Sequence, residues 1–588
     1  MSKRASLSIG LVPPVRNFRY HVARTIPSCY FSGLAQQMRT GAAFARWPYL
    51  LNVFFATFLD KQKSKNILKK NRTNYFLLKA LIVILGISGC QAPKHSAPID
   101  LTELTIADIH RAYTEGTFNS QQLVASYLER IEKFDEEINA ITTINPNALL
   151  MAKELDEAYQ KTKVLRPLHG IPIIVKDNIN TKGLPTTAGA LALKDFVPDE
   201  DAFIIQKLLQ AGAIIIAKSN MAEWAFSPKH TESSTAGTTR NPYNLDYVPA
   251  GSSGGTAASI AANFAVIGLG TDTGNSIRGP SSHCALVGFR TTLGLVSRSA
   301  IIPLYLRNDV VGPMCRTVED ATKVLEVIAG YDAADPLTRY SEGRLPANSN
   351  YSQFLVKDGL KGARIGVLRE LSDHEPDPEI SRLFEQALMD MDTLGAEIVD
   401  AVEIRDFSNL RQNQWCAVFR KDIESYLQTY VKNDTMKTLE DIIRVGTQSK
   451  FAADRLALFA KNNGRWEEPE IECLDAYSDV RRIAFREAIE KVMDSLQLDA
   501  LVYPSWNNKA ARIDFFEEEY KGDNNQVIAP HTGQAAFTVS MGFSEGNLPA
   551  GLQFLGRMYD EPTLIKLAYA YEQGTKHRVP ARLEQLEK

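Results

Sequence analysis

Cysteine is scarce in this sequence, and the cysteines that occur are scattered. Six cysteines stand among 588 residues, and no C-x-x-C pair is present. Disulfide-rich domains and structural zinc sites require closely grouped cysteines, or cysteines and histidines at fixed spacings. The sequence therefore predicts neither a disulfide framework nor a metal site. Most of the cysteines are expected to be small buried hydrophobic residues.

A surplus of charge of one sign is also absent. The 66 Lys and Arg residues nearly balance the 69 Asp and Glu residues, which leaves a formal net charge of -3. Proteins that bind nucleic acid usually carry a basic patch that contacts the phosphate backbone. The balance therefore argues against a nucleic-acid partner. Because 44% of the residues are hydrophobic, the chain has enough apolar material for a large core.

Apolar runs near the N-terminus are short. One begins at Ala80 and ends in small residues before Cys90, and several Lys and Arg residues precede it. A run of about ten apolar residues is too short to span a bilayer, but this order is typical of a signal peptide. Residues 68–90 are similar to a bacterial lipoprotein signal, which implies a lipid anchor on Cys90 and a location at the membrane of the cell envelope. The alternative is a short buried helix, with a cytoplasmic protein if the signal is not used.

This predicted signal lies deep inside the chain, whereas a signal peptide belongs at the start. Residues 1–67 are therefore expected to be a wrongly assigned start or a poorly structured extension. Residues 47–59 weaken that interpretation, because they are also apolar and would suit a second membrane-seeking segment. Residues 91–99 are predicted to form a polar spacer.

The remaining chain, residues 100–588, alternates between helical and strand patterns. Residues 119–134 place apolar side chains on one face of a helix. Residues 171–175 are apolar and mostly β-branched, which predicts a strand buried on both faces with Lys176 at its end. A helical stretch and a second strand-like run follow, as a parallel sheet requires. The order predicts an α/β fold.

We predict one large domain with a mixed, mostly parallel β-sheet that is covered by helices on both faces. Strand-like runs return at residues 498–504, 537–541 and 552–556, and a helix follows at 561–573. Residues 348–468 are more polar and mostly helical in pattern. They are predicted to be a helical insertion within the domain.

Two loops rich in serine and glycine carry the clearest functional signal. Residues 251–255 read Gly-Ser-Ser-Gly-Gly, and residues 270–278 read Gly-Thr-Asp-Thr-Gly-Asn-Ser-Ile-Arg. Together with the lysine that ends a buried strand, these loops resemble the amidase signature family. The resemblance extends over about residues 100–582. Segments 299–303 and 312–314 are most similar to the peptide amidase members of that family.

The resemblance implies an amidohydrolase that cleaves a carboxamide C–N bond and releases ammonia or an amine. Ser276 would form the acyl-enzyme, Ser252 would follow a cis peptide bond and relay the proton, and Lys176 would accept it. A lysine is a base near neutral pH only if burial lowers its pKa, which the apolar strand before Lys176 favours. The resemblance implies no cofactor and no metal, and the expected substrate is a small-molecule or peptide amide.

The same resemblance assigns the surroundings of the nucleophile. The backbone N–H groups of Thr273, Gly274 and Asn275 match the oxyanion hole of the family, where fixed donors stabilise charge on the carbonyl oxygen. Four neighbouring residues are expected to hold the catalytic groups in position, namely Ser253, Thr271, Asp272 and Arg278.

Three positions depart from the family pattern. Asn275 stands where glycine is nearly always found, Ala285 replaces another glycine, and Arg290 with Thr291 replaces a Lys-Pro pair. Asparagine adopts left-handed backbone angles more readily than most residues, so the oxyanion hole is expected to survive. Asn275→Gly is predicted to leave turnover unchanged or to raise it. The altered loop also motivates an alternative, a catalytically impaired envelope protein that binds a ligand.

A competing motif overlaps the first loop. Residues 251–255 fit the G-x-S-x-G nucleophile elbow of α/β-hydrolases, with Ser253 as nucleophile and His531 or His577 as base. An elbow follows a strand directly, whereas residues 244–249 are loop-like, so this interpretation is the less favoured one. The other histidines considered are expected to pack or form hydrogen bonds, namely His169, His230 and His283.

Overall fold

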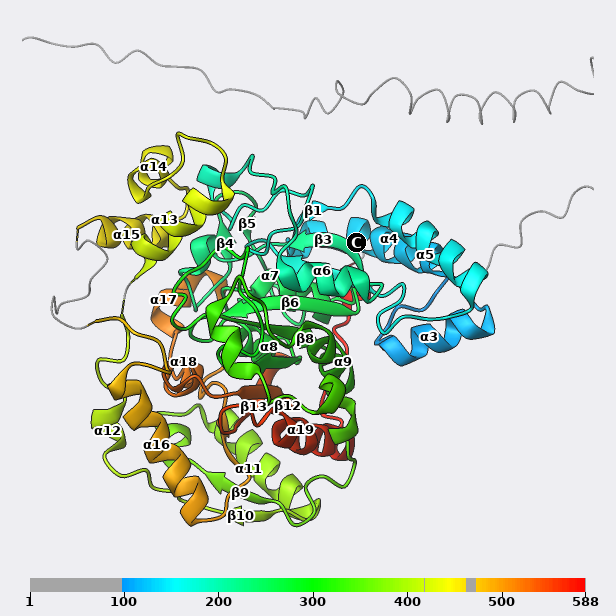
Figure 1. Cartoon of the computed structure of the whole chain (residues 1–588). Coiled ribbons are helices and arrows are strands. Elements are labelled where there is room, and N and C mark those ends of the chain that lie inside the picture. The colour runs from blue at the N-terminus through cyan, green and yellow to red at the C-terminus, as the bar shows by residue number, and fades with distance from the viewer. Residues whose placement is uncertain (1–97, 417, 462–471, 587–588) are drawn as a thin grey trace, which may run out of the picture. The chain divides into compact units, whose positions relative to one another are not determined.

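The structure is a computed structural model that describes residues 98–416, 418–461 and 472–586. Figure 1 draws these residues in colour. Cys90, the predicted signal at 68–90 and residues 1–67 lie outside the described residues, as does the predicted spacer up to residue 97. The fold and the site described for this chain lie within these residues, from residue 98 onward.

An 11-stranded sheet is the central layer of the described residues (Figure 1). Four of its ten neighbouring strand pairs are parallel and six are antiparallel. The prediction of one large α/β domain with a mixed sheet is confirmed, but the parallel share is smaller than expected. In spatial order the strands are β1 (Ile141–Ile144), β3 (Ile214–Ser219), β2 (Pro172–Lys176), β6 (Ile267–Asp272), β8 (Val310–Cys315), β7 (Val287–Arg290), β12 (Ala536–Ser544), β13 (Leu548–Leu555), β11 (Ala500–Pro504), β9 (Arg364–Val367) and β10 (Glu397–Val399).

The strands that precede the lysine and the serine loops form a parallel part of the sheet. β2 lies between β3 and β6 and pairs with both in parallel. Helix α6 (Phe203–Gln210) connects β2 to β3, and helix α7 (Gly254–Ala261) connects β3 to β6. These crossovers run in opposite directions along the sheet, so right-handed connections place the two helices on opposite faces. Every residue of the three strands is buried, which explains their apolar composition.

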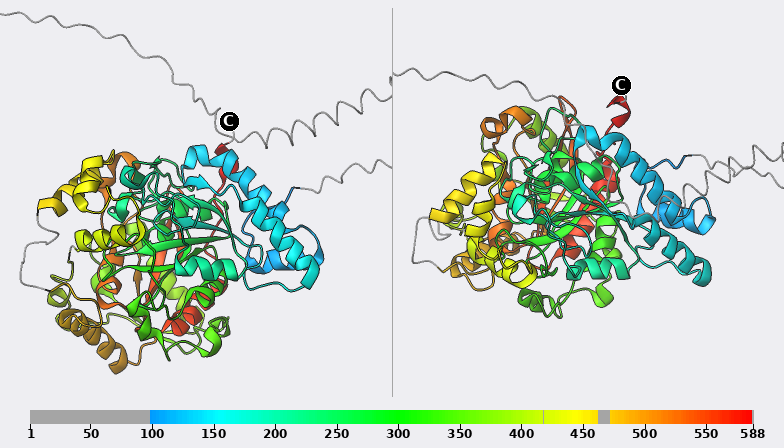
Figure 2. Two further views of the ribbon diagram at one scale, coloured as in Figure 1. Left: turned by 45° about the horizontal axis from the view of Figure 1, so that its top comes forward. Right: turned by 90° about the horizontal axis from the view of Figure 1, so that it is seen from above.

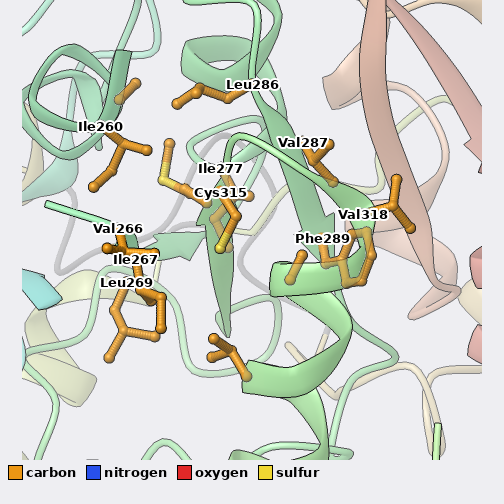
Figure 3. Close-up of a cluster of buried hydrophobic side chains, with 14 of the residues drawn as sticks. Ile260, Val266, Ile267, Leu269, Ile277, Leu286, Val287, Phe289, Cys315 and Val318 are labelled. Atoms are coloured by element: carbon orange, nitrogen blue, oxygen red, sulfur yellow. The ribbon is translucent and has the colours of Figure 1, made fainter. Parts of the chain in front are cut away.

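Apolar side chains close the space between α7 and the neighbouring strands. Figure 3 shows Ile260 of α7 and Leu269 of β6 among the side chains of this cluster, with Phe289 of β7 nearby. The ring of Phe289 stacks on Phe537 of β12 with centroids 3.7 Å apart. Cys315 lies in the same cluster and is a free, buried thiol, as the sequence predicted for most of the cysteines. Removing large side chains from such a core would cost several kcal/mol each, on the order of 3–5 for Phe→Ala.

Helices with well-defined starts surround the sheet. Asn119 and Gln122 form a capping box at the start of α4 (Ser120–Ile138), and Thr105 caps α3 (Ile106–Glu115) in the same way. The predicted helix at 119–134 is therefore confirmed. The further long helices around the sheet are α5 (Ala148–Thr162), α9 (Val318–Ile328), α11 (Pro378–Thr393), α16 (Val480–Ser495) and α19 (Glu561–Thr575).

The range 348–468 is not purely helical. Strands β9 and β10 fall inside it and extend the main sheet beyond β11. The pattern missed them because they are only four and three residues long, and β10 is a partly exposed edge strand. The helices of the range include α13 (Phe419–Tyr430), α14 (Leu439–Val445) and α15 (Lys450–Lys461). These three lie away from α3–α5 in every view (Figures 1 and 2).

One disulfide corrects the expectation from the cysteine pattern. Cys416 and Cys473 are bonded, with their Cα atoms 5.9 Å apart. They are 57 positions apart in the sequence, so no local motif marks the pair. Arg307 lies between the same two chain segments and donates hydrogen bonds to the carbonyl oxygens of Gln414, at 3.2 Å, and Leu474, at 2.8 Å. The tertiary path of the chain brings the two cysteines together.

Candidate active site

Lys176 is the last residue of β2 and is completely buried. Burial lowers the pKa of its amine from 10.5 to about 7, although the carboxylates of Asp272 and Asp309 act in the opposite direction. An ammonium group loses its hydration inside a protein, so the neutral amine is favoured there. The side chain therefore has the protonation behaviour of a base that works near neutral pH.

Ser252 lies in the loop just before α7 and contacts this lysine. The Ser252 hydroxyl oxygen lies 2.7 Å from Lys176 Nζ. The peptide bond between Gly251 and Ser252 is cis, as the family resemblance implied. Glycine is required before it, because a Cβ on Gly251 would lie 2.4 Å from the carbonyl oxygen of His230. The loop can therefore approach its neighbour closely and place Ser252 over the lysine.

Thr271 holds the other side of the lysine. Lys176 Nζ lies 2.8 Å from Thr271 Oγ1 and 3.4 Å from the Thr271 carbonyl oxygen. Ser253 donates a hydrogen bond to the same carbonyl at 3.1 Å, and Asn178 Nδ2 donates to Thr271 Oγ1 at 3.1 Å. Thr271 thus contacts the amine directly, and Ser253 contacts the carbonyl group of Thr271.

Ser276 lies in the turn between β6 and helix α8 (Arg278–His283). It lines a cavity of about 280 Å³ together with Thr273, Gly274 and Asn275. Ser276 Oγ donates a hydrogen bond to Asn275 Oδ1 at 3.4 Å. Among the described residues, the hydroxyl groups of Ser252 and Ser276 are not directly hydrogen-bonded to each other. The structure therefore brings the predicted triad and oxyanion residues to one place, but in the described residues the two serine hydroxyls have other hydrogen-bond partners.

Two of the three departures from the family pattern have a clear structural setting. Asn275 is not among the described residues with a left-handed backbone, so its position does not require glycine on conformational grounds. The left-handed angles considered for Asn275 are therefore not needed there. Ala285 does adopt a left-handed φ of 51°, which explains why glycine suits that position.

Arg290, which belongs to the third departure, contacts the buried Asp272. Asp272 is fully buried between two guanidinium groups, with Arg278 Nε at 3.1 Å and Arg290 Nη1 at 2.7 Å. Burial alone would raise the pKa of this carboxyl group, but Arg278 and Arg290 outweigh burial and lower it to about 2. Arg278 also donates to the Gly274 carbonyl oxygen at 2.7 Å. The charged cluster thus anchors the turn that carries Ser276.

Three contributors to the site were not singled out from the sequence. Asn178 contacts Thr271, and the Asp309 carboxylate accepts a 2.6 Å hydrogen bond from Thr273 Oγ1. Pro228 lines the cavity and accepts a hydrogen bond from Asn275 Nδ2 at 3.2 Å. Asn178 lies two residues after the lysine, which is a usable local signal. Asp309 and Pro228 have none, because they reach the site from distant loops.

The histidines of the competing α/β-hydrolase interpretation are engaged elsewhere. His577 Nε2 lies 2.8 Å from Asp390, and His531 Nε2 lies 3.0 Å from the Gln526 carbonyl oxygen. In the described ranges, neither imidazole contacts Ser253, whose hydroxyl donates to Thr271. His283 is buried against Trp506, and burial lowers its pKa to about 3. The arrangement does not support a Ser-His pair.

The outer part of the cavity is mostly apolar. Trp415 and Cys416 come from the segment before α13, and Arg455 and Phe459 come from α15. Besides residues 273–276, the remaining lining residues are Ala225, Phe226, Pro228, Leu304, Tyr305 and Gln526. An apolar wall with a few polar groups near the reacting atoms is the usual form of a small-molecule site.

Within residues 98–416, 418–461 and 472–586, no three His, Cys, Asp or Glu side chains are grouped so as to hold a metal ion. In the same part of the chain, no helix has both the length and the apolar character needed to cross a bilayer.

Comparison with known proteins identifies the family. A family model described as Amidase matches residues 122–565. A probable amidase of Arabidopsis thaliana is 32% identical over 522 residues, which cover 86% of this chain and 96% of the plant protein. The A subunit of a glutamyl-tRNA(Gln) amidotransferase from Caldanaerobacter subterraneus is 32% identical over 81% of this chain and 98% of its own length. The crystal structure of peptide amidase from Stenotrophomonas maltophilia superimposes with a TM-score of 0.73 at 35% identity, over 82% of this chain and 99% of that one.

The chain thus belongs to the amidase family, and the resemblance inferred from its two serine loops and lysine is confirmed. The predicted activity class is confirmed as well, because family and neighbours agree on enzymes that act on amide C–N bonds.

Proposed function

We propose that the chain hydrolyses a carboxamide through a serine acyl-enzyme. Ser276 Oγ attacks the amide carbonyl carbon, and its proton passes through Ser252 to Lys176. The C–N bond then breaks, and the proton returns to the leaving nitrogen, which departs as ammonia or an amine. Water, activated by the same groups, hydrolyses the acyl-serine ester and restores Ser276.

The observation that carries this proposal is the buried contact between Lys176 and Ser252. A neutral amine has two N–H groups and one lone pair. The two acceptors of Thr271, its hydroxyl and its carbonyl oxygen, suit the two N–H groups. The lone pair is then left for the Ser252 hydroxyl hydrogen, at an N–O distance of 2.7 Å. With a pKa of about 7, the lysine is neutral often enough to act as this base.

The turn at residues 273–276 supports the proposed stabilisation of negative charge on the carbonyl oxygen of the substrate. Its residues line the cavity, and Arg278 and Asp309 hold the turn through the Gly274 carbonyl and the Thr273 hydroxyl. Fixed N–H donors next to a nucleophile stabilise the oxyanion of the tetrahedral intermediate, typically by a factor of about 10²–10³ per donor. A rigid turn needs little rearrangement when this charge develops.

The test is covalent labelling with a fluorophosphonate probe, followed by peptide mapping. Wild-type protein should be labelled on Ser276, and Ser276→Ala should be neither labelled nor active. The rate of labelling should rise with pH up to about 7 and then level off, because the base must be unprotonated. Absence of labelling in folded wild-type protein would instead support the impaired, ligand-binding alternative.

The substrate is expected to be a small-molecule or peptide amide. A peptide amidase, the relative with a TM-score of 0.70 at 34% identity, has been solved with the competitive inhibitor chymostatin. The cavity of about 280 Å³ here suits one modest apolar group beside the amide. Screening short amides with ammonia detection would identify the class.

Two separate features support a site of action at the cell envelope. Residues 68–90 have the pattern of a lipoprotein signal ending at Cys90. The disulfide between Cys416 and Cys473 is a feature of oxidising compartments, which include the bacterial envelope. The proposed location is therefore the envelope membrane, with lipidated Cys90 as the anchor. Cys90→Ala should release the protein from membranes, whereas wild-type protein found soluble with residues 1–90 intact would contradict this location.

A further inference from the structure

Asn275 lies between two parts of the site. Its side chain is buried, and Nδ2 donates a hydrogen bond to the Pro228 carbonyl oxygen at 3.2 Å. Its Oδ1 accepts the hydrogen bond from Ser276 Oγ at 3.4 Å. One amide group therefore contacts both the nucleophile and a separate loop that lines the same cavity.

The Pro228 carbonyl oxygen also holds the turn of the relay serine. It accepts a hydrogen bond from the Gly251 N–H at 3.0 Å, directly before Ser252. The loop that contains Pro228 is seated tightly on Gly251, because a Cβ there would lie 2.5 Å from the Ser227 carbonyl oxygen. A single carbonyl thus joins the Asn275 amide to the Ser252 turn.

The amide has little space to move. A Cβ on Gly279 of α8 would lie 2.9 Å from Asn275 Nδ2, so the helix packs directly against it. The bond from Ser276, at 3.4 Å, is long for a hydroxyl donor and therefore weak. The amide is firmly placed, whereas the hydroxyl that it holds is easily released.

From this geometry we infer that Asn275 is a positioning residue for the two serines. Through Pro228, it holds the Ser276 turn at a fixed separation from the Ser252 turn. Its weak bond to Ser276 keeps the resting hydroxyl in place until the substrate binds and the hydroxyl turns to Ser252. Glycine at this position lacks both contacts. This inference rests on the roles proposed above for Ser276 and Ser252.

The test compares Asn275→Gly and Asn275→Ala with wild type. Both variants lose the amide, whereas only glycine loosens the backbone, so a shared effect belongs to the amide. We expect kcat and the fluorophosphonate labelling rate to fall about tenfold in both, as the loss of two modest hydrogen bonds predicts. The contacts of the Asn275 amide thus replace the expectation from sequence that Asn275→Gly leaves turnover unchanged or raises it. KM should change less than about twofold. The pH at which the labelling rate levels off should not move, because Asn275 does not contact Lys176.

The matched control is Asn507→Ala. Asn507 is another buried amide, and its Nδ2 donates to the carbonyl oxygens of Leu371 and His374, away from the cavity. This variant should lower Tm but label at the wild-type rate. If Asn275→Gly does not fold, Asn275→Ala carries the test, with Tm measured beside the rates.

Three results would overturn the inference. These are wild-type labelling rates in both Asn275 variants, a raised KM with unchanged kcat, and a shifted pH dependence. A failure of the proposed function is distinct, since it would appear as normal labelling of Ser276→Ala. Slow labelling of both Asn275 variants with wild-type KM supports the positioning role.

Discussion

The proposed catalytic centre and the outer wall of the cavity are built in different ways. At the centre, Lys176, Ser252 and Ser276 extend from strand ends and tight turns of the main sheet, and all three are buried. The outer wall uses larger side chains from outside the sheet, such as Trp415, which is 42% exposed, and Phe459 on α15. The comparison teaches that the proposed proton transfer relies on buried groups fixed by the main sheet, whereas the wall is made of side chains that lie outside that sheet.

The largest effect on turnover is expected when the residues of the proposed catalytic centre are replaced one at a time. Lys176→Ala should lose at least about 10²-fold in turnover, the usual worth of a general base. Ser252→Ala should lose less, because a water molecule can replace its hydroxyl in the relay. Ser253→Ala should be nearly normal, since its hydroxyl donates only to the Thr271 carbonyl oxygen. Steady-state turnover of these variants and of Ser276→Ala, measured at one pH, gives the order of the losses in activity.

The opposite order would favour the α/β-hydrolase interpretation. In that case Ser253→Ala would be inactive, while Ser276→Ala and Lys176→Ala would remain active. Circular dichroism of each variant serves as the folding control.

The second effect concerns the ion cluster that anchors the centre. Asp272→Asn leaves Arg278 and Arg290 buried without their carboxylate partner, so the free energy of unfolding should fall by about 3–5 kcal/mol. The folded-state pKa of Asp272, about 2, lies below its ordinary value of 3.8. Its stabilising contribution is therefore complete above pH 3.8 and is lost as the pH falls through about 2.

Urea unfolding of wild type and Asp272→Asn at several pH values measures this contribution. The difference between the two proteins should shrink at the acidic end. A difference that stays constant down to about pH 2 would show that the carboxylate does not carry the effect. The exposed pair of Lys432 and Asp199 offers a control, since Lys432→Ala should leave the urea midpoint nearly unchanged.

The third effect belongs to the disulfide next to the wall. Its loop spans 57 positions, so loss of the cross-link should cost about 2–4 kcal/mol through the entropy of the unfolded chain. Cys473→Ser, or reductant added to wild type, should lower the urea midpoint. Labelling of Ser276 should continue at low temperature, because the centre does not include the disulfide.

Thiol titration provides the control for this prediction. In unfolded, unreduced protein, Cys284 and Cys315 should react, and Cys416 and Cys473 should react only after reduction. Reaction of all four without reductant would contradict the disulfide.

The smallest effect is expected at the wall itself. Trp415→Ala should raise KM about three- to tenfold for amides with one aromatic group, through loss of aromatic contact, with kcat nearly unchanged. Acetamide, which has no ring, should be affected little. Val480→Ala is the control, because Val480 is 77% exposed and does not line the cavity.

Aromatic substrates with the ring on either side of the amide would sharpen the comparison. If the wall binds the acyl group, Trp415→Ala should affect phenylacetamide more than N-benzylacetamide. The reverse would assign the wall to the leaving amine. Equal KM values for Trp415→Ala and wild type on both substrates would show that the wall does not select the ring.

Much of the centre was predictable because its signals are local. The buried strand ending in Lys176 and the two glycine-rich serine loops are contiguous patterns, and the structure brings them together at the carboxyl ends of β2 and β6. Parallel strands end at the same edge of a sheet, so adjacent strands converge without further information. The wall and the short strands β9 and β10 had no comparable pattern.

By itself, the sequence determined the fold class, the family and the residues of the two serine loops. Periodicity and short motifs depend only on neighbours in the chain, so they can be recognised without the fold. Only the tertiary structure decided which distant groups complete the site. Pro228 and Asp309 reach it from separate loops, and Cys416 finds Cys473 across 57 positions. Such contacts depend on the packing of the whole domain, because closing long loops is opposed by chain entropy and is offset only by the assembled core.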